Sequence, residues 1–353
     1  MIKEALVEKP PREEVGLLEW LKRNLFSTWY NTLLTFVSLA FLFFVGRAII
    51  VWALHTARWE VVTTNIKVFM IGRYPASEAW RVLASLGVIL LLTALTWVFR
   101  KLRGRPIRQW LILGWLLSFP LIGVLLRGFS EQNLFLPLVS SRVWSGLLLT
   151  LVLAIVGITA SFPLGLILAL GRRSKLPVIK ILCTIYIETI RGVPLISVLF
   201  MSQLMLPLFL PPHIRLSTVM RALTGITLFS AAYTAENVRG GLASVPVGQY
   251  EAARSLGLSN VLMMVLIVLP QALRAVIPAI VGQFISLFKD TTLVVIVGLL
   301  DLLGVAKAVT GQRQFIGLHQ EVYFFVALLF FIFCSLMSRG SRRLERSLGV
   351  GER

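Results

Sequence analysis

Long apolar segments separated by short charged stretches follow one another along almost the whole chain. Many of them reach about 17 to 25 residues, the length that an α-helix needs to cross the hydrocarbon core of a bilayer. We predict eight membrane spans, at residues 32–53, 81–99, 110–126, 143–170, 178–208, 219–238, 261–285 and 320–338. The pattern therefore predicts an all-α polytopic membrane protein.

Composition and charge agree with this fold class. Of the 353 residues, 57% are hydrophobic and 14% are charged, and the mean hydropathy is +0.84. The net charge of +19 would also suit nucleic-acid binding, but the basic residues cluster at residues 100–109, 171–180 and 339–346. Basic clusters that alternate with weakly charged loops follow the positive-inside rule, so we expect these clusters and both termini to be cytoplasmic. We expect contact with the lipid membrane and no binding of nucleic acid.

The chain divides near Phe135 in this interpretation. Residues 1–135 form an N-terminal extension with about three spans, residues 136–346 hold five spans and every unusual motif, and residues 347–353 form a cytoplasmic tail. Residues 286–319 carry too many polar side chains for a standard span. We predict a broken or re-entrant helix there, because irregular backbone at membrane depth must be covered by protein or line a cavity.

The external loop at residues 54–80 and its border carry four aromatic residues, Trp52, Trp59, Tyr74 and Trp80. Amphipathic aromatic rings are enriched at membrane–water interfaces. We therefore expect these rings to anchor the loop at the membrane surface.

A short polar loop at residues 240–260 carries the segment Glu251-Ala-Ala-Arg-Ser-Leu-Gly257, which is followed by Ile267-Val-Leu-Pro270. Ser244 is a candidate N-cap for a short helix that tolerates Pro246 in its first turn. Gly257 stands where a left-handed C-terminal cap would end this helix. Ser259 is a candidate N-cap for the next one.

The same loop has the features of a surface for a partner protein. Ala252 and Ala253 would leave a low-relief surface, Tyr250 and Leu256 are candidate anchors, and Glu251 offers a carboxylate. An ordinary solvated amphipathic loop is the alternative interpretation of Glu-Ala-Ala alone. The glycine and the Ile-x-Leu-Pro segment, at the spacing EAA-x3-G-x9-I-x-L-P, favour the partner surface.

Charged residues inside apolar segments are the second unusual feature. A charge at the bilayer centre costs at least about 2.5 kcal/mol on insertion scales. Glu188 and Arg191 lie three residues apart in an apolar helix, which predicts a structural ion pair, and Glu236 and Arg239 repeat this spacing. Polar residues of the sixth and seventh spans and of the break that follows are candidates to line a substrate pathway: Tyr233, Glu236, Gln283, Ser286, Lys289, Asp290, Thr291 and Thr292.

Several of these segments together resemble the polar amino-acid branch of ABC importer permeases, the membrane subunits of type I binding-protein-dependent importers. Besides the Glu-Ala-Ala loop, the matching segments are Glu188-Thr-Ile-Arg-Gly-Val-Pro-Leu195, Ala232-Tyr-Thr-Ala-Glu-Asn-Val-Arg-Gly-Gly241, Ser244-Val-Pro-Val-Gly-Gln249 and Lys289-Asp-Thr-Thr-Leu293. The resemblance covers about residues 140–346, and the additional N-terminal spans look like those of the longer permease subunits of general L-amino-acid transporters. Val193, Asn237 and Thr292 stand where the family usually has Thr, an aliphatic residue and Ser, which leaves the substrate preference open.

This resemblance implies a five-helix type I ABC importer core at the C-terminal side. The chain would be a permease subunit that takes up polar or general L-amino acids across the bacterial cytoplasmic (inner) membrane. The implied partners are two ATP-binding subunits, a second and usually different permease subunit, and a periplasmic amino-acid-binding protein. The sequence has no G-x-x-x-x-G-K-[ST] motif, so ATP and Mg²⁺ would belong to the partner ATPase. The chain itself is expected to be non-catalytic, with no cofactor and no metal.

The resemblance also gives the candidate residues their roles. The ATPase would contact the residues of the polar loop, Gln249, Tyr250, Glu251, Ala252, Ala253, Leu256 and Gly257. A zwitterionic amino acid needs hydrogen-bond donors for its carboxylate and acceptors for its ammonium group. The pathway candidates Glu236, Gln283, Ser286, Lys289 and Asp290 carry groups of both kinds, and Tyr233 would bound the substrate's side chain.

Two other classes of protein remain as alternatives. An ion-coupled secondary amino-acid transporter often has inverted repeats with two matching broken helices, whereas this sequence has one evident break. A membrane enzyme or assembly scaffold is the other possibility. His55, His213 and His319 lie in different regions, without the spacing of metal ligands or of a catalytic triad.

Overall fold

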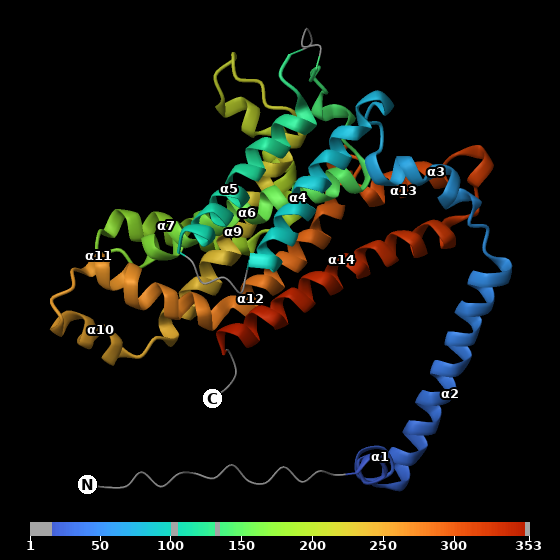
Figure 1. Cartoon of the computed structure of the whole chain (residues 1–353), viewed down its shortest axis with the longest axis horizontal. Helices are drawn as coiled ribbons and strands as arrows, with labels where there is room; N and C mark the ends of the chain where they lie inside the picture. Colours follow the sequence, from blue (N-terminus) through green and yellow to red (C-terminus); the bar gives the residue numbers. More distant parts are fainter. Residues whose placement is uncertain (1–15, 100–104, 131–134, 350–353) are drawn as a thin grey trace. The chain divides into compact units, whose positions relative to one another are not determined.

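The computed structural model describes residues 16–99, 105–130 and 135–349, and it divides the chain into two compact units, Met1–Trp59 and Glu60–Arg353. Every regular element of the described residues is helical, and β-pairing is limited to isolated bridges (Figure 1). The all-α fold predicted from the sequence is confirmed.

The first unit consists of two helices, α1 (Leu17–Leu25) and α2 (Trp29–Val51), and a π-helical turn (Trp52–Thr56) that prolongs α2. The side chain of Thr28 caps α2 by accepting a hydrogen bond from the Asn31 N–H. The α2 helix is apolar on all sides, and none of its residues is buried within the chain. This composition is that of a helix surrounded by lipid or by another membrane protein.

The second unit contains the remaining helices, several of which have short 3-10 or π-helical turns between them. They are α3 (Glu60–Ile71), α4 (Ala79–Phe99), α5 (Arg105–Arg127), α6 (Gly146–Arg172), α7 (Pro177–Gly192), α8 (Leu195–Leu204), α9 (Thr218–Ser244), α10 (Val247–Ser255), α11 (Asn260–Met263), α12 (Leu269–Asp290), α13 (Leu302–Thr310) and α14 (His319–Leu348). Helices α10 and α11 lie at one end of this unit, and α3 and α13 lie at the other end (Figure 1).

Among the described residues, six helical segments are long and apolar enough to cross a membrane, and a seventh span results if α7 and α8 are counted as one. These segments coincide with seven of the eight predicted spans. The remaining prediction, residues 219–238, corresponds to α9, whose 27 residues are long enough but include many Ser, Thr, Gly and charged residues. Because α9 packs against α6, α7, α8 and α12, polar residues such as Thr227, Ser230 and Thr234 are buried in protein.

Small residues allow α6 and α9 to pack closely. Gly157, Ser161, Gly165 and Ala169 recur at every fourth position of α6, and all four are buried. A Cβ atom added at Gly165 would lie 2.6 Å from the Cβ of Thr234 on α9. Such stripes of small residues let two helix backbones approach each other in a membrane.

Two helical elements are broken where the sequence gives a local reason. The axes of α7 and α8 differ by 111° at a break that contains Pro194, and the preceding Val193 is extended, as residues before proline tend to be. After α12, a 3-10 segment (Thr291–Val297) ends at the left-handed Gly298, and the Asp301 carboxylate then caps α13. The predicted break within residues 286–319 is thus confirmed.

The loop at residues 54–80 differs from its predicted interfacial role. Within it, α3 packs against α6, α13 and α14. Tyr74 is 2% exposed, and its hydroxyl donates a hydrogen bond to the Leu126 carbonyl at 2.8 Å. The expectation that Tyr74 anchors the loop at a membrane surface is wrong, because its ring fills a cluster with Val82 and Leu148.

Two left-handed glycines make this packing possible. At Gly146 (φ +66°) an added Cβ atom would lie 2.5 Å from the Phe69 carbonyl oxygen, and at Gly72 (φ +59°) it would overlap the Ser145 hydroxyl. The Gly146 N–H also donates to the Leu300 carbonyl at 2.9 Å. Three distant chain segments therefore meet at the start of α6, in what we call the α6 junction.

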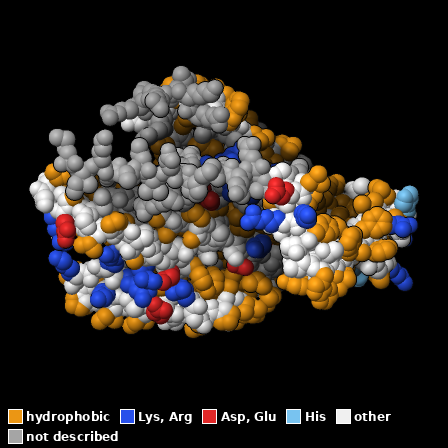
Figure 2. Space-filling model, turned by 90° about the horizontal axis from the view of Figure 1, so that it is seen from below, with side chains coloured by type: hydrophobic (Ala, Val, Ile, Leu, Met, Phe, Trp, Pro, Cys, Tyr) orange, Lys and Arg blue, Asp and Glu red, His pale blue; other side chains and the backbone are white. Residues whose placement is uncertain are grey.

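Wide apolar surfaces remain on the second unit. Leu90 and Trp97 on α4 and Leu116 on α5 are each about two-thirds exposed, at 68%, 67% and 66%. On the face shown in Figure 2, hydrophobic side chains cover large areas and the charged side chains lie in groups between them. Apolar surface of this extent is expected where lipid is the solvent.

Candidate functional site

The polar loop at residues 240–260 forms the short helix α10. The left-handed C-terminal cap predicted at Gly257 is confirmed, with φ +74°. The Leu258 N–H donates to the Ala253 carbonyl at 3.2 Å, which closes the turn. Ser259 caps α11 as predicted, by accepting a hydrogen bond from the Leu262 N–H.

The predicted N-cap of α10 is wrong. Ser244 is the last residue of α9, and its hydroxyl donates to the Gly241 carbonyl at 2.9 Å. The residue at the cap position is Pro246, which has no side-chain hydrogen bond to offer. Proline's fixed φ nevertheless starts the helix, because it suits the turn between two helices.

One side of α10 is open to a partner. Glu251, Ala252, Leu256 and Gly257 are exposed, and so is Gln249 on the side that meets α12. Leu256 is 79% exposed, and no hydrogen bond or ion pair of the Glu251 carboxylate is found in the part of the chain that the structure describes. Leu256 therefore leaves apolar surface at the end of α10 that a partner protein can cover.

Two predicted coupling residues face the permease itself. Ala253 is 2% exposed and packs in a cluster with Val245 and Met263, so only Ala252 of the pair presents a small side chain to the outside. Tyr250 is half-buried, and its hydroxyl donates to the Leu242 carbonyl at 3.3 Å. Both residues therefore fix α10 to the helices behind it.

Two side chains and one backbone carbonyl, from three other parts of the chain, hold α10 in place. Arg173, directly after α6, donates from Nη1 to the Tyr250 hydroxyl at 3.1 Å and to the Leu242 carbonyl of α9 at 3.3 Å. Its guanidinium also lies over the Tyr250 ring, 5.8 Å from the centroid. On the other side, Gln271 of α12 donates to the Gln249 side chain at 3.0 Å. A displacement of α10 would therefore pull on its hydrogen-bond partners at α6, α9 and α12.

A cluster of charged residues, which we call the Glu236 cluster, lies beside these contacts. Arg239 makes two hydrogen bonds to the Glu236 carboxylate, at 2.6 and 2.9 Å. Arg172 reaches the same carboxylate at 3.3 Å and Glu188 at 2.8 Å, and Arg191 lies 3.6 Å from Glu236. One carboxylate is thus shared by arginines from α6, α7 and α9.

The predicted ion pair between Glu188 and Arg191 is not formed. Although the two residues lie one helical turn apart, Glu188 pairs with Arg172 and Arg191 pairs with Glu236. Pairs between helices prevail here because Arg172 projects from the end of α6 towards both carboxylates. The second predicted spacing, Glu236 with Arg239, does form a pair.

The pathway candidates fall into two groups. Tyr233 and Glu236 belong to the Glu236 cluster. The Tyr233 hydroxyl lies 3.5 Å from the Arg191 carbonyl, and the Arg191 guanidinium lies over the Tyr233 ring. With three arginines around it, Glu236 is already neutralised within the chain.

The second group lies on the C-terminal part of α12 and directly after it. Gln283, Ser286 and Asp290 are half-buried, and Lys289 is exposed. The hydroxyls of Thr291 and Thr292 donate to the carbonyls of Phe288 and Lys289, at 2.7 and 2.8 Å. Among the described residues, no hydrogen bond or ion pair joins this group to the Glu236 cluster.

Two residues of the site were not predicted from the sequence. Arg172 and Arg173 were counted only as part of a basic cluster that orients the chain, yet one enters the Glu236 cluster and the other holds α10. The available signal was the excess of arginine over carboxylate in the five-span region. It does not identify which group each arginine binds, because Glu236 and Tyr250 lie more than 60 residues away and Glu188 lies on another helix.

A family of known sequences matches the chain over residues 161–350, and its description is "Binding-protein-dependent transport system inner membrane component". This segment includes the Glu236 cluster, α10 and the broken segment after α12.

Similar proteins extend the match. The inner membrane amino-acid ABC transporter permease protein YhdY of Escherichia coli is 40% identical, over 98% of both chains. The glutamate/glutamine/aspartate/asparagine transport system permease protein BztC of Rhodobacter capsulatus is 36% identical, over 98% of this chain and 97% of its own. A crystal structure of an amino-acid ABC transporter with histidines is 31% identical, with a TM-score of 0.51, and its matched chain corresponds to 57% of this one.

Proposed function

The chain belongs to the family of binding-protein-dependent transport system inner membrane components, as a permease subunit of an ATP-driven amino-acid importer, and from this premise we propose that α10 is the helix that the ATPase moves. The observation that supports this role is the contrast between its two sides. The outer side exposes Leu256 and the unpaired Glu251, whereas the inner side is tied to three helices through Tyr250 and Gln249.

The consecutive arginines at the end of α6 give the proposed path of the movement. Arg173 binds Tyr250 of α10, and Arg172 binds Glu236 and Glu188 in the core. ATP binding would close the ATPase dimer and pull α10, and the pull would pass through these adjacent residues into α7 and α9. Hydrolysis would then reset the arrangement.

The partners follow from the family. We propose two ATP-binding subunits that hold ATP and Mg²⁺, a second permease subunit, and a periplasmic amino-acid-binding protein. The chain would sit in the bacterial inner membrane with α10 and both termini on the cytoplasmic side. The basic clusters at residues 171–180 and 339–346 support this orientation.

The proposed substrates are polar amino acids. The name of YhdY includes "amino-acid", and the name of BztC gives glutamate, glutamine, aspartate and asparagine. Both proteins match nearly the whole chain. An uptake assay with these four amino acids in proteoliposomes, with ATP inside, tests the substrate class. Uptake that follows an ion gradient without ATP would instead indicate a secondary transporter.

Gly257→Asp tests the coupling role of α10. The position is left-handed, and no atom lies within 4 Å of an added Cβ, so the side chain would project into the space that a partner would fill. Gly317→Asp is a matched control, because Gly317 is also left-handed (φ +92°) and equally open but lies before α14. We expect Gly257→Asp to abolish co-purification of the ATPase and ATP-driven uptake, and Gly317→Asp to retain both. Intact uptake in Gly257→Asp would refute the role.

A further inference from the structure

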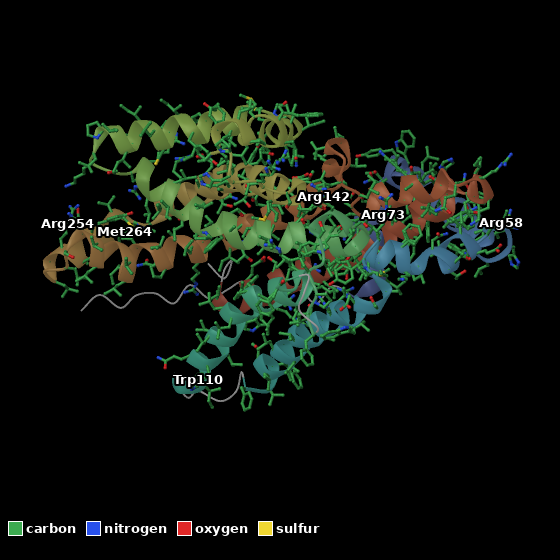
Figure 3. The ribbon with its side chains drawn as sticks, turned by 90° about the horizontal axis from the view of Figure 1, so that it is seen from above. Arg58, Arg73, Trp110, Arg142, Arg254 and Met264 are labelled. Atoms are coloured by element: carbon green, nitrogen blue, oxygen red, sulfur yellow. The ribbon has the colours of Figure 1, made fainter. Side chains whose placement is uncertain are left out.

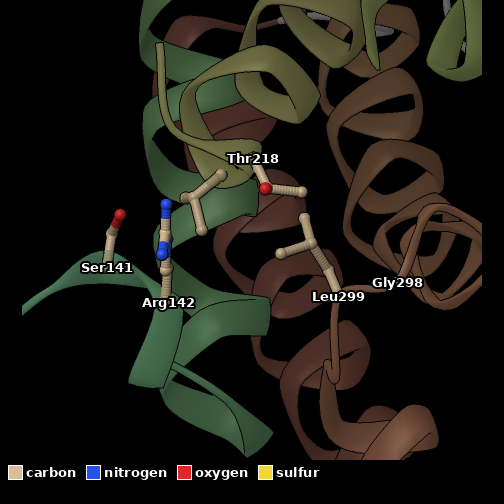
Figure 4. A pocket seen from close by; sticks show the side chains of 6 residues that line it. Ser141, Arg142, Thr218, Gly298 and Leu299 are labelled. Atoms are coloured by element: carbon tan, nitrogen blue, oxygen red, sulfur yellow. The ribbon is translucent and has the colours of Figure 1, made fainter. Parts of the chain in front are cut away.

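A hollow of about 180 Å³ lies in the second unit at the end away from α10, lined by Ser141, Arg142, Thr218, Val219, Gly298 and Leu299 (Figure 4). Its walls come from the 3-10 turn before α6, from the first turn of α9 and from the break after α12. The 27 residues of α6 extend over about 40 Å between this end and Arg172. Figure 3 accordingly shows Arg142 far from Arg254 of α10.

The Arg142 side chain at this hollow is exposed, and Ser141 and Thr218 are half-buried. Among the described residues, no hydrogen bond or ion pair is found for the guanidinium of Arg142 or for the hydroxyls of Ser141 and Thr218. Arg221 on the same turn of α9 contrasts with them, because it donates to the carbonyls of Leu216 and Gln203. Figure 4 shows the Arg142 and Thr218 side chains on adjacent sides of the space, facing Leu299.

Backbone donors point to the charge of the ligand. Thr218 and Val219 are the first two residues of α9, whose N–H groups have no acceptor within the helix. The N-cap, Ser217, accepts from the Met220 N–H and leaves these two without an acceptor in the described residues. A guanidinium, a hydroxyl and the positive end of a helix dipole together favour an anion, and a planar carboxylate suits a guanidinium best.

We propose that the hollow between Arg142, Thr218 and Leu299 is a receiving site for the α-carboxylate of an amino acid at the extracytoplasmic end of the permease. The inference rests on the proposed function, which sets the cytoplasmic side at α10. The free volume is many times the roughly 10 to 15 Å³ that one water molecule needs by the same measure, so it has room for the charged end of an amino acid. Val219 and Leu299, 2% and 6% exposed, are apolar walls against which its carbon atoms can lie.

The location suits a site of entry. The 3-10 segment that begins at Thr291 and Thr292 ends at Gly298, so the hollow adjoins the segment that carries pathway candidates. Left-handed Gly298 has no atom within 4 Å of an added Cβ, which keeps this wall open. An acidic side chain of the docking binding protein is the competing occupant, and the experiment separates the two.

The test uses the complete transporter of both permeases and the ATPases in nanodiscs, without binding protein. Binding of L-glutamine, L-glutamate, L-asparagine and L-aspartate is measured beside L-glutaminamide, in which a neutral amide replaces the α-carboxylate of glutamine. We expect the wild type to prefer glutamine to the amide. Arg142→Ala should weaken glutamine binding about tenfold or more and reduce that preference. Arg142→Lys should lose less, and Arg215→Ala, an exposed arginine in the loop before α9, should lose nothing.

Several results would overturn the proposal. The site is refuted if glutamine binding is unchanged in both Arg142→Ala and Thr218→Val, or if the wild-type complex shows no preference for the free carboxylate. It is also refuted if Arg142→Ala weakens only the affinity for the binding protein, because the occupant is then an acidic side chain of that protein. If wild-type proteoliposomes import none of the four amino acids, the proposed function fails as well. Import by the wild type with unchanged binding in the variants refutes the site alone.

Discussion

The two ends of α6 and α9 are built differently. At the α10 end, Arg172 and Arg173 bind a carboxylate, a hydroxyl and a carbonyl oxygen of other elements, and Arg239 binds Glu236 on its own helix α9. At the opposite end, Arg142 and Thr218 line a hollow, and no such partner of their side chains is found among the described residues. The charge pairs between helices stiffen the α10 end, whereas unpaired groups can bind a ligand. This difference is what our two proposals require, in which the α10 end transmits the movement of the ATPase and the other end receives substrate.

The α6 junction, at the other end, is also tightly packed. Of the changes considered, Gly146→Ala should therefore have the largest effect on the free energy of unfolding. The methyl group would enter the space of the Phe69 carbonyl at a left-handed position, where relaxation requires movement of backbone. We expect a loss of about 3 kcal/mol or more in the free energy of unfolding.

The measurement is a detergent-denaturation titration of the purified permease. Gly123→Ala in α5 is the control, because Gly123 has no atom within 4 Å of an added Cβ and no positive φ. It should be neutral or stabilising by up to about 1 kcal/mol. Equal stabilities of the two variants would show that the α6 junction is more compliant than its geometry indicates.

Removal of the central carboxylate tests the stiffness at the α10 end. Glu236→Gln would leave three arginines close together without their shared counter-charge, and the Glu236 side chain is only 23% exposed. We expect a loss of about 2 kcal/mol in the free energy of unfolding, below the range for a fully buried pair. The same titration measures it.

Glu188→Gln is the matched control for that change. Glu188 has one arginine partner and a side chain that is 55% exposed, so we expect a loss well under about 1 kcal/mol. A loss in Glu188→Gln as large as that in Glu236→Gln would place the centre of the cluster elsewhere.

Arg173→Ala separates stability from coupling. Its hydrogen bonds to Tyr250 and Leu242 lie near the surface, and their removal should cost only about 1 kcal/mol of folding free energy. The amount of amino acid imported per ATP hydrolysed should nevertheless fall several-fold, because α10 loses its contact with α6. Lys175→Ala, an exposed residue two positions later, should leave the ratio unchanged. An unchanged ratio in Arg173→Ala would exclude the path through α6.

Loss of a helix cap should give the smallest effect. Ser217 caps α9 beside the hollow and Ser259 caps α11 beside α10, each through one backbone N–H. Ser217→Ala and Ser259→Ala should each cost about 1 kcal/mol or less and speed hydrogen exchange of the Met220 and Leu262 amides. Ser217→Thr should retain protection, and a much larger loss at Ser217 would mean that its hydroxyl also serves the hollow.

Local signals in the sequence were sufficient for much of this structure. Apolar length located the spans, and Gly257 and Ser259 marked the ends of short helices because their effects depend on neighbouring backbone only. The break after α12 was visible as polar residues in an apolar segment. The sequence also predicted that Glu236 and Arg239 pair, since both lie on the same turn of one helix.

Features that depend on distant partners could not be predicted in this way. Glu188 pairs with Arg172 instead of its near neighbour Arg191, because the end of α6 comes close to it in the fold. Ala253 points inward, and Tyr74 is buried, for the same kind of reason. The hollow at Arg142 combines residues from three segments, so no spacing in the sequence indicates it.

The α6 junction also has a consequence for the order of events during synthesis. The Leu302 N–H donates to the Thr150 hydroxyl, which lies 152 residues earlier in the chain, and the neighbouring Gly146 N–H uses the Leu300 carbonyl. At a translation rate of about 5 to 20 residues per second, the start of α6 exists for on the order of ten seconds before these hydrogen-bond partners have been made. During that interval α3 and α6 have no α13 to pack against. The α6 junction can therefore close only after α13 has been synthesised.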